Sequence, residues 1–144
     1  MRAGAPKPDL STPDALKQAL LKAQSIAFLP ASAAGAQVIK VFERLGIAEE
    51  MKAKTKVQPS PAAIPQAVAK GEAELGIFLI NVLIAPGVDF AGPFPTEVQQ
   101  ELVFTAAASA DTKDIDGAKA LIAFLKSAGA AAVIKAKGME PIAR

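Results

Sequence analysis

The stretch SIAFLPASAAGAQVIKVFERLG, residues 25–46, determines the fold that the sequence predicts. Its first part, Ser25–Pro30, is a short apolar run with the length of a buried strand. A loop of small residues, Ala31–Gly35, leads into a helix that Gly46 ends. The apolar residues of this helix recur at the helical period: Val38, Val41, Phe42 and Leu45. A buried strand followed by an amphipathic helix is the repeating unit of an α/β protein.

The same alternation continues on both sides of this stretch. Thr12, Pro13 and Asp14 form an N-cap, a first-turn proline and a first-turn acid, so a helix is predicted to run to about Ala23. The elements predicted further along the chain are a short helix at Ala48–Lys54, a strand at Thr55–Gln58, a helix capped by Ser60 and Pro61 that reaches Lys70, and a strand at Glu74–Ile80.

The last third of the chain adds an extended segment, one strand and two helices to the prediction. The expected elements are the segment Val88–Phe94, the strand Glu101–Ser109, a helix at Asp114–Ser127 and a helix at Ala130–Lys137 that ends at Gly138. The inner face of the first of these helices is predicted to carry Ala118, Leu121, Ile122 and Leu125. The whole pattern predicts an α/β fold with a mainly parallel sheet flanked by helices.

The composition fits an ordinary folded domain. The chain has 144 residues, of which 51% are hydrophobic and 21% charged, which is enough apolar surface to build a core. The net charge of +2 does not provide the clustered excess of positive charge that binding to nucleic acid requires. The basic run Lys52, Lys54 and Lys56 is interpreted as a solvent-exposed connection. The most apolar stretch, Gly76–Pro86, is about half the length that a membrane span needs, so no transmembrane segment is expected.

Four residue types are absent from the sequence: Cys, His, Trp and Tyr. Their absence removes thiolate nucleophiles, imidazole bases and every zinc site built from Cys or His. Ser, Thr, Lys and carboxylates remain, with no side chain whose ordinary pKa lies near neutral pH. We therefore expect that the chain is not an enzyme, and the sequence implies no metal and no cofactor.

Two stretches of small residues are candidates for binding an anion through backbone N–H groups at helix N-termini. They are Ser32-Ala33-Ala34-Gly35 and Ser60-Pro61-Ala62-Ala63, and each follows a predicted strand directly. At the carboxyl ends of parallel strands, both would face one crevice. A structural role alone also explains them, since small residues permit tight turns and Ser60 can act as an N-cap only.

Several segments along the chain resemble a known protein family. The segments that carry the resemblance are PKPDLSTPDALKQALLKAQSIAF, ERLGIAEE, AVAKGEAELGIFLI, GVDFAGPFPTEVQ, AKALIAFLKS and KAKGMEPI. In this order and spacing they look like the second half of the molybdate-binding family of periplasmic solute-binding proteins, the capture components of ABC importers. The resemblance implies a type II periplasmic-binding-protein lobe over residues 1–95, then a returning strand and C-terminal helices over residues 96–144. It also implies that the first lobe is largely missing.

The resemblance places the family's ligand donors on particular residues of this chain. One backbone donor falls on Ala34, and a second falls at Pro61, which has no N–H group. The family's tyrosine hydroxyl falls on Leu79. With their neighbours, the expected ligand-binding residues are Ser32, Ala33, Ala34, Gly35, Ser60, Ala62 and Leu79. The ligand site is therefore expected to be an altered version of the family's site.

The expected function is that of a solute-binding module related to oxyanion capture, which takes a small anion or another small solute. The resemblance implies a periplasmic location and an ABC transporter membrane component as a partner, although Met1–Leu10 has no apolar core of a signal peptide. The alternative is a non-transport interaction protein that keeps the fold and assembles with itself or with a partner that supplies the first lobe. Apolar residues on several faces of Asp114–Ser127, Phe124 among them, predict a homo-oligomer. In it, this helix, the final helix Ala130–Lys137 and the strand Glu101–Ser109 pack against a second copy.

Overall fold

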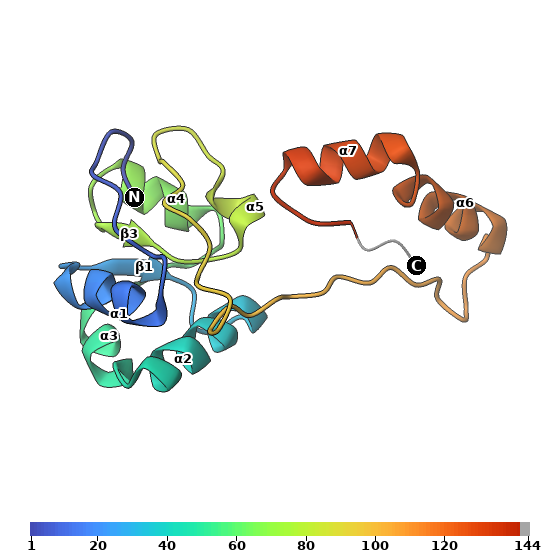
Figure 1. The fold of residues 1–144 in the computed structure, drawn as a ribbon. Coiled ribbons are helices and arrows are strands. Elements are labelled where there is room, and N and C mark those ends of the chain that lie inside the picture. Colours follow the sequence, from blue (N-terminus) through green and yellow to red (C-terminus); the bar gives the residue numbers. More distant parts are fainter. Residues whose placement is uncertain (142–144) are drawn as a thin grey trace. The chain divides into compact units, whose positions relative to one another are not determined.

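The computed structural model describes residues 1–141, which form two units. The first unit is Met1–Glu101 and the second begins at Leu102 (Figure 1). The elements of the first unit are α1 (Pro13–Lys22), β1 (Ile26–Phe28), α2 (Ala33–Leu45), α3 (Ala48–Lys54), β2 (Thr55–Val57), α4 (Ala63–Ala69), β3 (Leu75–Gly76) and α5 (Ile80–Leu83). Those of the second unit are α6 (Ile115–Leu125) and α7 (Ala128–Ala136).

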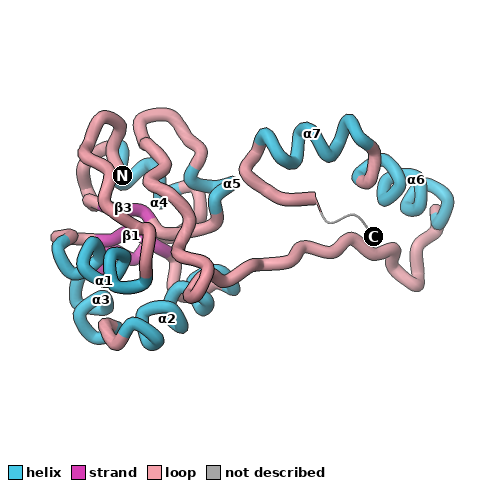
Figure 2. The backbone as a smooth tube through the Cα atoms, in the orientation of Figure 1, coloured by secondary structure: helices cyan, strands magenta, loops and turns pink. Residues whose placement is uncertain are grey.

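The three strands of the first unit form one parallel sheet in the order β2-β1-β3. Ile26 pairs with Thr55 on one side of β1 and with Leu75 on the other. Figure 2 shows the three strands together, enclosed by the helices of this unit. The structure therefore confirms the predicted α/β fold with a parallel sheet flanked by helices.

Helices cover both faces of this sheet. Successive side chains of β1 point to opposite faces, so this strand contributes to two cores. Ile26 and Phe28 belong to the larger core, which α1, α2 and α3 complete with Leu16, Leu20, Val38, Val41, Phe42 and Met51. Ala27 belongs to a smaller core on the opposite face, where it contacts α4 through Ile64, Ala67 and Val68. A strand that is buried on both sides explains the uninterrupted apolar run in the sequence.

The helix ends agree with the sequence signals in the first part of the chain. The Thr12 side chain accepts a hydrogen bond from the Ala15 N–H and so caps α1. Gly46 ends α2 with a φ of 66°, a left-handed conformation that glycine adopts without steric cost. The predicted boundaries of α3 are confirmed at both residues.

Strand β3 is shorter than predicted, with Leu75–Gly76 in place of Glu74–Ile80. Its ladder to β1 uses the carbonyls of Ser25 and Ala27 as acceptors, for the N–H groups of Leu75 and Ile77. The next acceptor in that alternation is the Leu29 carbonyl, which instead accepts a hydrogen bond from the Ser32 hydroxyl. The ladder ends at this point, and the chain turns into α5.

The second unit differs from the prediction in two respects. Residues 102–109 form no helix or strand, so the strand predicted at Glu101–Ser109 was wrong. The β-prone residues of this segment have no neighbouring strand in their unit to pair with, and β-propensity without a partner does not make a strand. Leu121 and Leu125, predicted to face inward on α6, are 59% and 40% exposed.

Helices α6 and α7 are each capped by a local side chain. Asp114 accepts a hydrogen bond from the Gly117 N–H, and Ser127 accepts one from the Ala130 N–H. No single helix within residues 1–141 has the length and apolar character to cross a membrane. Helices α6 and α7 reach that length only together, and they are bent by 61° at the break between them.

The position of Gly35 generates a stability prediction. A Cβ at this residue would lie 2.0 Å from the Leu29 carbonyl oxygen, a backbone atom that cannot move aside. We expect Gly35→Ala to lower the free energy of unfolding by about 2 kcal/mol or more. Because the chain has no Trp or Tyr, urea unfolding is best followed by far-UV circular dichroism. The control is Ala36→Ser at the next, exposed residue; equal losses in both variants would contradict the prediction.

Candidate functional site

The candidate site lies at the carboxyl edge of the parallel sheet. Three loops leave this edge: residues 29–32 after β1, residues 58–62 after β2, and residues 77–79 after β3. Because the strands are parallel and β1 is central, its loop leaves between the other two. The topology thus brings the two predicted small-residue stretches and Leu79 to one edge of the sheet.

Ser32 fixes the start of α2 through two hydrogen bonds. Its hydroxyl donates to the Leu29 carbonyl over 2.8 Å and accepts from the Gly35 N–H over 2.9 Å. A hydroxyl has one proton, so Ser32 cannot also donate to a ligand while this arrangement holds. The role of Ser32 in the structure is to cap and anchor the helix.

The backbone N–H groups of Ala33 and Ala34 remain at this helix end. The Gly35 N–H bonds to Ser32, and the Ala36 N–H bonds to the Ser32 carbonyl, whereas the first two N–H groups of α2 have no partner within residues 1–141. Ala33 is exposed, whereas the whole Ala34 residue is only 6% exposed. The helix dipole adds positive potential at this position.

Ser60 does not cap α4, so that part of the prediction was wrong. The helix begins at Ala63 with Ala62 as its N-cap, and no side chain caps it. The Ser60 carbonyl accepts the Ala63 N–H and the Pro61 carbonyl accepts the Ile64 N–H, so a tight turn replaces a capped first turn. The Ser60 hydroxyl has no hydrogen-bond partner in the described part of the chain, and it is half-buried.

Leu79 is the N-cap residue of α5, and its carbonyl accepts the Val82 N–H. Its side chain is half-buried and can contribute only apolar contact. Asn81 lies within α5 and is half-buried. The edge near β3 thus supplies apolar surface and one amide side chain.

No ionisable side chain occurs in any of the three edge loops. Their sequences are LPAS at residues 29–32, QPSPA at residues 58–62 and IFL at residues 77–79. Binding at this edge would therefore rely on N–H groups, hydroxyls and the α2 dipole, which is a chemistry that holds small anions without a fixed positive charge. Within residues 1–141, no group of three or more acidic, His or Cys side chains could hold a metal ion.

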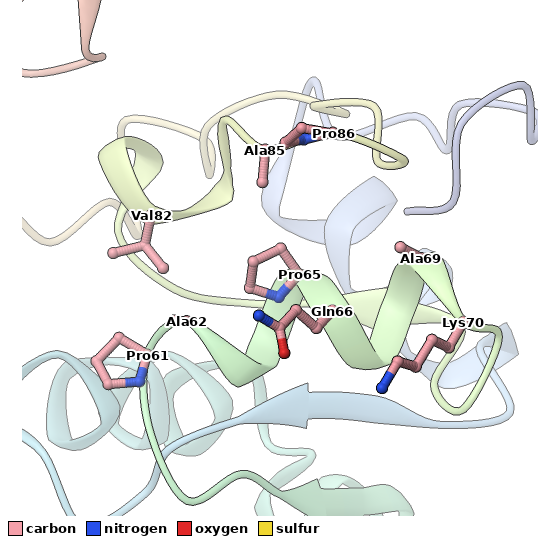
Figure 3. Close-up of a pocket in the computed structure, with 9 residues that line it drawn as sticks. All are labelled: Pro61, Ala62, Pro65, Gln66, Ala69, Lys70, Val82, Ala85 and Pro86. Carbon is pink, nitrogen blue, oxygen red and sulfur yellow. The ribbon is translucent and has the colours of Figure 1, made fainter.

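A groove on the outer side of α4 was not predicted from the sequence. It has a volume of about 640 Å³ and is lined by Pro61, Ala62, Pro65, Gln66, Ala69, Lys70, Val82, Ala85 and Pro86. Figure 3 shows Val82, Ala85 and Pro86 across the groove from Pro65. The signal in the sequence is the recurrence of proline, since Pro61, Pro65 and Pro86 all line the groove. Of the predicted site residues, Ala62 alone lines this groove.

Comparisons with known proteins show to which class of protein the chain belongs. The profile of the family described as "Bacterial extracellular solute-binding protein" matches residues 1–140. A Pseudomonas protein named aconitate isomerase is 36% identical over 144 residues, which cover 99% of this chain and 54% of that protein. The molybdate-binding protein ModA of Azotobacter vinelandii is 32% identical over 126 residues, covering 85% of this chain and 50% of ModA.

The chain therefore belongs to the bacterial extracellular solute-binding protein family. The resemblance to molybdate-binding proteins is confirmed by the match to ModA. The chain spans about half the length of the curated relatives that it matches. The expectation that the chain is not an enzyme has mixed support, because one relative carries an enzyme name while the family is one of solute-binding proteins.

The different roles of the two serines can be tested directly. Ser32→Ala removes the cap of α2 and should lower the free energy of unfolding by about 1 kcal/mol. Ser60→Ala should leave stability within about 0.5 kcal/mol of the parent, because Ser60 caps nothing. Urea unfolding of both variants measures the difference. A loss at Ser60 that matches the loss at Ser32 would show that both serines are caps.

Proposed function

We propose that this chain is the ligand-holding module of a solute-binding protein and that it binds a small anion at the carboxyl edge of its sheet. The observation that carries the proposal is the arrangement at the start of α2. Ser32 and Gly35 hold the helix end against Leu29, and the N–H groups of Ala33 and Ala34 are left without an internal partner. Paired backbone donors at a helix N-terminus are a common anion site.

The proposed ligand class is small carboxylates and oxyanions. The relatives are named for molybdate and for aconitate, and both are small anions. The resemblance to molybdate binders places a backbone donor at Pro61 and a hydroxyl at Leu79, and this chain offers neither group. Each missing hydrogen bond to a charged ligand costs about 1.5–3 kcal/mol, so molybdate should bind about 10²- to 10⁴-fold more weakly than in a complete site.

Binding is proposed in preference to turnover. Isomerisation by proton transfer requires a base within hydrogen-bond reach of the ligand, and the three edge loops contain no ionisable side chain. Turnover of a small carboxylate is the second candidate, and the 36% identity to an aconitate isomerase favours it. In that case the base would have to come from outside these loops.

Two partners belong to the proposal. Membership of a solute-binding family supports an ABC transporter membrane component as the recipient of the ligand. The second unit supports self-association, because Leu121, Phe124 and Val133 are 59%, 63% and 60% exposed. Exposed apolar surface of this kind is characteristic of an interface.

The anion site can be tested with Ala33→Asp. Ala33 is exposed, so an aspartate there places a carboxylate beside the N–H groups without burying it, whereas the buried Ala34 would not tolerate the same change. At about ten times its Kd, a bound anion should stabilise the parent protein by about 1.4 kcal/mol, and Ala33→Asp should abolish this gain. Thermal unfolding with sulfate, phosphate, molybdate and citrate measures it.

The matched control is Ala53→Asp, an exposed alanine near the end of α3 that receives the same change of charge. This variant should retain the full stabilisation by the anion. Equal protection of the parent and Ala33→Asp would refute the site. Submicromolar binding of molybdate to the parent, measured by calorimetry, would refute the altered ligand set. Interconversion of added aconitate isomers by the chain would favour the second candidate.

Self-association has its own measurement. Light scattering at micromolar concentration should give a mass near twice the 14.7 kDa of one chain. Replacing the exposed Phe124 by Ser should shift the distribution toward the monomer, because the replacement removes apolar area from the interface. A mass of one chain at every concentration would contradict self-association and would leave the anion proposal untouched.

A further inference from the structure

We draw no further inference here: the strongest candidate, the largely apolar groove between α4 and residues 82–86, is an open surface of a chain that spans about half the length of its curated relatives, and nothing in the structure shows what covers it.

Discussion

The carbonyl oxygen of Leu29 is the atom on which the start of α2 and the candidate site depend. The Ser32 hydroxyl donates to it, and the Gly35 backbone lies so close to it that no side chain would fit. The same Ser32 hydroxyl accepts the Gly35 N–H and so caps α2, and together these contacts fix the position of the Ala33 and Ala34 N–H groups. A helix end positioned by backbone packing can attract an anion without any charged side chain.

The neutrality of the edge has a consequence for function. Donors made of backbone N–H groups do not titrate, so the edge offers a ligand hydrogen bonds and potential but no proton to exchange near neutral pH. On the proposal of binding at this edge, conversion of the ligand would need a base from outside the three loops. Discrimination among anions at such an edge depends on shape and on how many N–H groups and hydroxyls surround the ligand.

The sequence predicted those parts of the fold that local signals and burial decide together. Thr12 and Gly46 mark helix ends correctly, and the apolar run through Ile26 predicts a central strand. The prediction failed where pairing with a distant strand decides: nothing near Leu79 reveals that the ladder with β1 ends at the Ala27 carbonyl, so β3 was predicted too long. The same limit applies to the site, since the sequence shows that Ser32 and Ser60 precede helices but not which hydroxyl is committed.

The second unit shows what local signals can do alone. Asp114 and Ser127 cap its helices, yet among residues 102–141 only Ala130 is buried. Caps contribute about 1 kcal/mol each, which is too little to fix helices of this length in water without packing. Any surface that covers Leu121 and Phe124 must therefore supply most of the stability of this unit. Under the proposed self-association, folding of this unit and association form a single equilibrium, in which the concentration of the second copy sets how much of the unit is folded.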